Sequence, residues 1–149
     1  VQTCALPISD KAFTLVTDKT GASSLLSRPK NLSVVVGVSA SRLQQIFLES
    51  RILMHPSLYE GWCLPAADAL QSGLRVVFTS GSGIDEVCSY APERVTPVPR
   101  EESVEGWTEY LRAALKAAEE QPLCANMSTN LPTWDECAEK TLKIYRSLL

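Results

Sequence analysis

Two runs of aliphatic residues constrain this chain most, Leu32–Gly37 (LSVVVG) and Arg75–Thr79 (RVVFT). A strand with one face in water alternates apolar and polar residues, whereas these runs are apolar nearly throughout, which predicts strands buried on both faces. Such strands are typical of parallel sheets whose crossover helices cover both sides. The chain is therefore predicted to be an α/β protein with a Rossmann-like parallel sheet and helices on both faces.

The segments around these runs follow the same alternation. Three further short strands are expected, at Ala12–Thr17, Arg51–Met54 and Arg94–Val98. Helical periodicity and end signals predict helices at Ser39–Ser50, Leu64–Ser72, Ser82–Tyr90, Glu101–Glu120 and Trp134–Leu148. In such sheets ligands bind at the carboxyl ends of the strands. The loops after Gly37, Met54 and Thr79 are therefore the places to look for a site.

Several of these helices carry apolar faces or capping signals. The aromatic stripes of the last two helices, which begin at Glu101 and Trp134, are interpreted as core contacts rather than as a cofactor site. Gly73 is expected to stop the helix before it. The spacing of Ser82 and Asp85 indicates a capping box, with Asp in the usual place of Glu.

Size and composition exclude several classes of protein. The 149 residues, 45% hydrophobic and 21% charged, suit one globular domain. The net charge is −3 and no basic run occurs, which argues against a nucleic-acid binder. No apolar run approaches the roughly 20 residues that a membrane span needs.

The cysteines indicate free thiols in a reducing compartment, so a cytoplasmic location is expected. The chain has five, Cys4, Cys63, Cys88, Cys124 and Cys137, at wide spacings, and one histidine, His55. A zinc site requires four ligands close together, which these spacings do not offer, so no metal site is predicted.

The first eight residues, VQTCALPI, do not fit the rest of the chain. They lack the charged start and the length of a signal peptide, and they resemble a translated sequencing adaptor. Residues 1–8 are therefore expected to be a non-native leader and residues 9–149 to form the domain. The native chain is expected to continue upstream of Ser9.

The loop Pro56–Cys63 is the most informative segment for function, because it leads directly into a helix. Pro65 suits the first helical position, which would make Leu64 the N-cap. Leucine is a poor cap, so the first amides would be free to bind an anion such as a diphosphate, and Gly61 would allow a close approach. The alternative is that water satisfies these amides and the loop is only a connector.

Two carboxylates flank this predicted anion site. Glu60 precedes the helix and Asp68 lies at or just past its first turn. An ionised carboxylate accepts hydrogen bonds from sugar hydroxyls, so the pair suits recognition of a sugar beside the phosphates. The alternative is two solvated acids.

Two weaker candidates have structural interpretations. The turn Ser80–Gly83 (SGSG) lacks the lysine and spacing of a P-loop and is expected to cap the next helix rather than hold phosphate. His55 stands at a strand end with no second histidine, and it is interpreted as a packed or hydrogen-bonded residue that borders the site.

The segment PSLYEGWCLP (56–65), followed by DALQSG (68–73), resembles the signature of glycosyltransferase family 4, the group 1 glycosyltransferases. The family pattern is a Glu, then Gly, an aromatic residue, Gly, Leu and Pro, with a second Glu eight positions after the first. The resemblance continues through RVVFT (75–79), IDEV (84–87) and WDECAEKTLKIY (134–145). It implies the C-terminal, donor-binding half of a retaining enzyme with the GT-B fold, truncated at its N-terminus.

Carried over by position, the resemblance implies a role for each site residue. Glu60 matches the residue beside the transferred sugar and diphosphate, and Asp68 matches the residue that holds the ribose. The backbone of Gly61, Trp62, Cys63 and Leu64 matches the turn that contacts the sugar and diphosphate. Gly37 and Val38 match the turn that touches the nucleotide base. The resemblance implies a nucleotide diphosphate sugar as donor, no cofactor and no metal.

The resemblance also implies a partner, an N-terminal acceptor domain of the same enzyme that this chain lacks. Any contact with a membrane would be made by that half. The fragment alone is expected to be inactive.

Two departures from the family pattern keep other functions open. Asp68 is one methylene shorter than the usual Glu, and Cys63 stands where Gly is common. A degenerate, non-catalytic module that binds a nucleotide or a partner therefore remains the alternative, and an epimerase of the same fold is a third possibility.

Overall fold

The computed structural model describes residues 11–25, 29–121 and 130–148. Its strands are β1 (Phe13–Thr17), β2 (Leu32–Val36), β3 (Ile52–His55), β4 (Arg75–Thr79) and β5 (Val95–Val98). Its α-helices are α1 (Lys19–Ser23), α2 (Ala40–Glu49), α3 (Leu64–Gln71), α4 (Ile84–Ser89), α5 (Val104–Glu120) and α6 (Trp134–Ser147). A 3₁₀ turn at Pro92–Arg94 precedes β5. The predicted leader lies outside the described residues.

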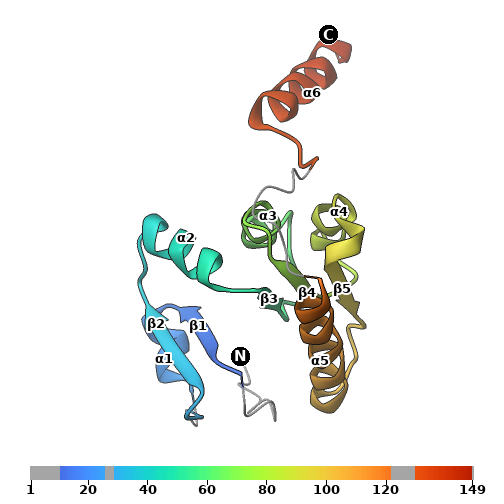
Figure 1. The fold of residues 1–149 in the computed structure, drawn as a ribbon. Coiled ribbons are helices and arrows are strands. Elements are labelled where there is room, and N and C mark those ends of the chain that lie inside the picture. The colour runs from blue at the N-terminus through green and yellow to red at the C-terminus, as the bar shows by residue number, and fades with distance from the viewer. Residues whose placement is uncertain (1–10, 26–28, 122–129, 149) are drawn as a thin grey trace.

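All strand pairs are parallel, which confirms the predicted α/β class. The described strands form two sheets rather than one, however, with orders β1-β2 and β3-β4-β5 (Figure 1). In the second sheet Val76 pairs with Leu53 on one side and with Val95 on the other. Which strands pair depends on contacts between residues far apart in the chain, so the residue pattern within each strand could not predict this division into two sheets.

Helices cover both faces of the three-stranded sheet, as predicted. The strands β3, β4 and β5 follow one another in one direction, so right-handed crossovers place α3 and α4 on the same face. Val76 and Phe78 pack on that face, in a core with Leu70. Val77 points the other way and packs with Val98 and Leu111 of α5. The central strand β4 is consequently buried along its whole length.

The prediction that Leu32–Gly37 is buried on both faces is wrong. No residue of β2 is buried, and Val36 is 41% exposed. Among the described strands it pairs with β1 alone, so its apolar sequence indicates strand propensity rather than burial on both faces.

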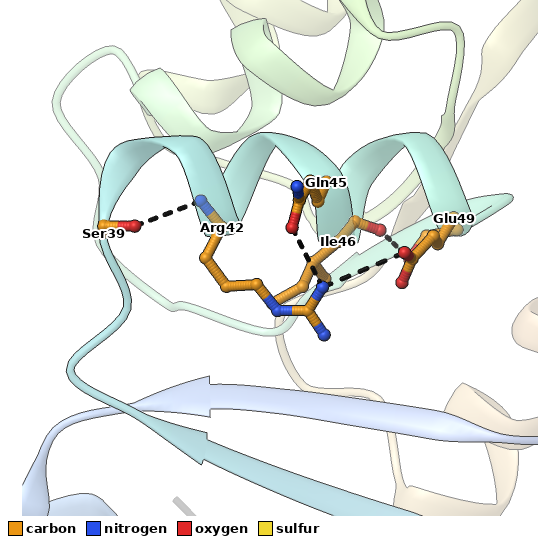
Figure 2. A network of polar contacts seen from close by, with 6 residues as sticks. Ser39, Arg42, Gln45, Ile46 and Glu49 are labelled. Carbon is orange, nitrogen blue, oxygen red and sulfur yellow. Dashed lines mark hydrogen bonds and ion pairs between the residues drawn. The ribbon is translucent and has the colours of Figure 1, made fainter.

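Helix α2 matches the prediction closely and connects the two sheets along the chain. Ser39 caps it, with its hydroxyl accepting from the Arg42 amide at 3.2 Å. On its exposed face the Arg42 guanidinium donates to Gln45 at 3.2 Å and lies 3.9 Å from Glu49, as Figure 2 shows. Ile46 and Phe47 are its buried residues.

The last two helices were both expected to be core elements, and one of them is not. Helix α5 buries Leu111, Ala114 and Ala118, and it begins at Val104, later than predicted, because Ser103 caps it. Helix α6 buries no residue, and Trp134 is 79% exposed. It stands away from the rest of the described chain (Figure 1). Its apolar stripe was correctly found, but nothing in the described residues covers it.

No helix in the described ranges is both long and apolar enough to cross a membrane.

Candidate functional site

Three loops meet at the carboxyl edge of the three-stranded sheet. β3 ends at His55 and leads into the loop before α3, β4 ends at Thr79 and leads into Ser80–Gly83, and β5 ends at Val98, shortly before Arg100. Parallel strands bring these ends to one edge, which is where open α/β sheets bind ligands. The predicted loops after Met54 and Thr79 therefore lie together.

Helix α3 starts one residue earlier than predicted. Cys63 is its N-cap and Leu64 its first residue, which places Pro65 in the second position. The expectation that Leu64 is the cap is therefore wrong. The expectation that no side chain caps the helix is confirmed, since Cys63 makes no capping hydrogen bond. At the other end Gly73, with φ 86°, terminates the helix as predicted: its amide donates to Leu70 and the next amide donates to Ala69.

The turn before α3 leaves a run of free backbone donors. The amides of residues 61–64 donate to no described residue, whereas Ala66 and Ala67 both donate to the Cys63 carbonyl at 3.1 and 3.3 Å. Unpaired amides at a helix N-terminus favour an anion. The free donors thus belong mainly to the loop and to Leu64, rather than to the whole first turn of the helix.

Glu60 is held in place by His55. The His55 Nε2 atom lies 2.8 Å from Glu60 Oε1, and the side chains are 20% and 24% exposed. This hydrogen bond holds the pKa of the Glu60 carboxyl below its ordinary value, against the opposing effect of burial. Glu60 is therefore ionised at neutral pH, and His55 is the hydrogen-bonded neighbour that the sequence predicted.

The other predicted residues of this segment differ in accessibility. Gly61, Leu64 and Asp68 are exposed, and Asp68 lies beyond the first turn of α3. Cys63 is buried and Trp62 packs against the core beneath α3. Glu60 and Asp68 thus lie on either side of the turn, and Trp62 within the turn packs against the core.

Gly37 and Val38 are not joined to the other site residues. Gly37 follows β2 with φ 64°, a conformation that favours glycine, and its amide donates to Thr17 at 3.4 Å. Among the described residues, no hydrogen bond or ion pair connects Gly37 or Val38 with the Glu60–Asp68 segment. Their proposed contact with a base stays a prediction.

Two supporting residues were missed by the sequence analysis. A Cβ on Gly83 would lie 1.3 Å from the Gly61 carbonyl oxygen, and the Gly83 amide donates to the Glu60 carbonyl at 3.1 Å. The Arg100 guanidinium donates to the Leu58 carbonyl and lies 4.5 Å from the centre of the Tyr59 ring. Gly83 and Arg100 each lie shortly after the end of a strand, at the carboxyl edge of the sheet. This position in the chain is the signal that could have identified them.

The turn Ser80–Gly83 leads into α4 and supplies its N-cap, Gly83, but no side chain caps the helix there, so the predicted capping box is wrong. Asp85 accepts from the amides of Gly81 and Ser82 at 2.7 and 2.8 Å. The Ser82 hydroxyl is buried and has no partner among the described residues. Because Asp85 takes these two amides, they are not free to hold a phosphate.

We expect Asp85→Ala to lower the free energy of unfolding by about 1 kcal/mol, because it loses two hydrogen bonds to the backbone of the turn before α4. Urea denaturation measures the change. Glu86→Ala, at the exposed neighbouring position, should leave stability unchanged within about 0.5 kcal/mol. Equal losses in the two variants would show that Asp85 does not stabilise this turn.

The described cysteines are free thiols, as predicted, and one of them lies at the site. Donor atoms of His55, Glu60 and Cys63 all lie within 4.8 Å of one another. The sequence analysis predicted no cluster of metal-ligating side chains, and the structure shows this group of three. Burial raises the pKa of the Cys63 thiol to about 11 and that of the Cys88 thiol to about 12.

Comparison with known proteins agrees with this architecture. Residues 23–134 match the family profile of glycosyl transferases group 1. The chain is also 31% identical over 108 residues to one of the subunits of human phosphatidylinositol N-acetylglucosaminyltransferase, in an alignment that covers 69% of this chain and 22% of that protein. The chain thus spans about a fifth of the length of this relative. No solved structure matches the chain. The family profile covers most of the chain, including β2, the three-stranded sheet and the segment around Glu60, so the chain belongs to the group 1 glycosyltransferases.

Proposed function

We propose that the chain forms the donor-binding part of a retaining glycosyltransferase that uses a nucleotide diphosphate sugar. The family match over residues 23–134 carries the proposal, because it includes the segment where free amides and carboxylates meet at the carboxyl edge of the sheet. Transfer of the sugar to a hydroxyl acceptor would be the work of the whole enzyme in the cytoplasm, with its N-terminal acceptor domain. We expect no transfer by this chain alone.

The proposed mechanism rests on charge stabilisation. The amides of residues 61–64 and the N-terminus of α3 would hold the diphosphate and stabilise the charge that develops as it leaves. These groups need no cofactor or metal for that task. Glu60, which its hydrogen bond with His55 keeps ionised, would accept hydrogen bonds from the sugar rather than contact the phosphates.

Asp68 would accept hydrogen bonds from the ribose hydroxyls. It is exposed, and within the described residues its carboxylate makes no hydrogen bond, so it is available to a ligand. Gly37 and Val38 would contact the nucleotide base.

Calorimetric titration with UDP-, GDP- and ADP-sugars in the presence of EDTA tests the proposal. We expect one of these donors to bind, and Glu60→Gln and Asp68→Asn each to weaken binding about tenfold, because each replaces a charged hydrogen-bond acceptor by a neutral, weaker one. Glu86→Gln, an exposed carboxylate on α4, is the matched control and should leave affinity unchanged.

Two results would overturn the proposal. One is the absence of binding by any of the three donors. The other is binding that Glu60→Gln and Asp68→Asn leave intact, which would favour the non-catalytic module instead.

A further inference from the structure

We propose that His55, Glu60 and Cys63 form a binding site for a thiophilic divalent cation, with Zn²⁺ as the best fit. Their donor atoms lie within 4.8 Å of one another, and one pair, His55 Nε2 and Glu60 Oε1, is 2.8 Å apart. Imidazole, carboxylate and thiolate are the three ligand types that proteins use for zinc. This assignment goes beyond the proposed transferase function, which requires no metal.

The backbone at Cys63 is the second observation. Its φ of 60° makes it the one non-glycine residue with positive φ in the described part of the chain. A left-handed conformation is unfavourable for a residue that carries a side chain, and such strain is concentrated at functional sites. Glycine adopts this conformation without strain, so a residue that merely shaped the turn would need no side chain. A role for the thiol explains why the chain tolerates the strain.

The geometry requires only small adjustments. In a tetrahedral zinc site the ligand atoms lie about 3.5 Å apart, given metal–ligand distances of about 2.0–2.3 Å. The hydrogen between His55 Nε2 and Glu60 Oε1 would have to leave, with the imidazole taking the tautomer that carries its proton on Nδ1, so that Nε2 can bind the metal. The thiol would approach by roughly 1 Å and lose its proton to solvent as the metal binds.

Three protein ligands leave the fourth position of the metal open. His55 and Glu60 are each about one fifth exposed, so water can reach that position. Sites with three protein ligands and one open position are the kind that exchange their fourth ligand, in contrast to closed structural sites. The cation would therefore bind reversibly and would not be needed for folding.

Cobalt spectroscopy of the full chain tests this site, because Co²⁺ replaces Zn²⁺ and reports a bound thiolate by a charge-transfer band. The background variant has serine at Cys4, Cys124 and Cys137, so that Cys63 and Cys88 are the remaining thiols. We expect one Co²⁺ per chain with a sulfur-to-cobalt band, displaced by one equivalent of Zn²⁺.

Cys63→Ser and Cys88→Ser form a matched pair of variants, since both thiols are buried in the same core. Cys63→Ser should abolish the band and Cys88→Ser should retain it. His55→Gln, checked for folding by circular dichroism, should weaken Co²⁺ binding at least about tenfold, because even residues behind the ligands contribute that much.

The inference would be overturned if the background variant showed no sulfur-to-cobalt band. It would also be overturned if the band survived Cys63→Ser, or if His55→Gln bound Co²⁺ as tightly as its parent. In those cases His55 and Glu60 form a hydrogen-bonded pair beside a buried thiol. Because Glu60 belongs to both proposals, the cobalt titrations contain no nucleotide, and the donor titrations contain EDTA, so that each can fail separately.

Discussion

Gly83→Ala is expected to lower the free energy of unfolding by about 3 kcal/mol and to weaken binding of the nucleotide sugar. The new Cβ would lie 1.3 Å from the Gly61 carbonyl oxygen and 3.0 Å from the Glu60 carbonyl oxygen. Both neighbours are backbone atoms, so no side-chain rotation can relieve the clash. The turn that carries the free amides must move instead. Urea denaturation and donor titration measure the two effects.

Gly61→Ala is the matched control for stability. A Cβ at this position meets no atom within 4 Å, so the free energy of unfolding should change by about 0.5 kcal/mol or less. If Gly83→Ala proved as stable as Gly61→Ala, the close packing of the loop after β4 against the turn before α3 would be wrong.

Leu70→Ala is expected to destabilise the protein by about 2–5 kcal/mol, since it leaves a cavity beneath α3. The Leu70 side chain is fully buried, in the core between the sheet, α3 and α4. Its backbone carbonyl also accepts a hydrogen bond from the buried Arg94 guanidinium at 2.8 Å. Core packing and this hydrogen bond therefore both stabilise the end of α3. The midpoint of urea denaturation should fall while the slope stays constant, because the denatured state is little changed.

Leu48→Ala provides the comparison. Leu48 lies on α2 and is 63% exposed, so its removal should change stability by no more than about 0.5 kcal/mol. Similar losses in Leu48→Ala and Leu70→Ala would show that the core does not lie where the structure places it.

Most of the secondary structure could be predicted from the sequence, because its signals are local. Ser39 and Gly73 mark helix ends by hydrogen bonds to residues within a few positions of themselves. Short helix α1 was not predicted, since its five residues include a glycine and carry no apolar face.

The candidate site was predicted less completely. The segment from Glu60 to Asp68 is continuous in the chain, so a family motif and a helix N-terminus could be recognised within it. Gly83 and Arg100 support this segment from other loops, and only the meeting of the strand ends at one edge brings them to it. The group of His55, Glu60 and Cys63 depends on a left-handed backbone at Cys63 that no local pattern announces.

The sequence by itself determined the α/β class, most element boundaries and the family, because hydrophobic period, capping residues and motif spacing are properties of neighbouring residues. Three features follow from the tertiary structure alone. The strands divide into two sheets, and β2 and α6 stay exposed. The loop after β4 packs closely against the turn before α3. An apolar stripe shows that a surface favours burial, but whether another surface covers it depends on contacts between residues far apart in the chain.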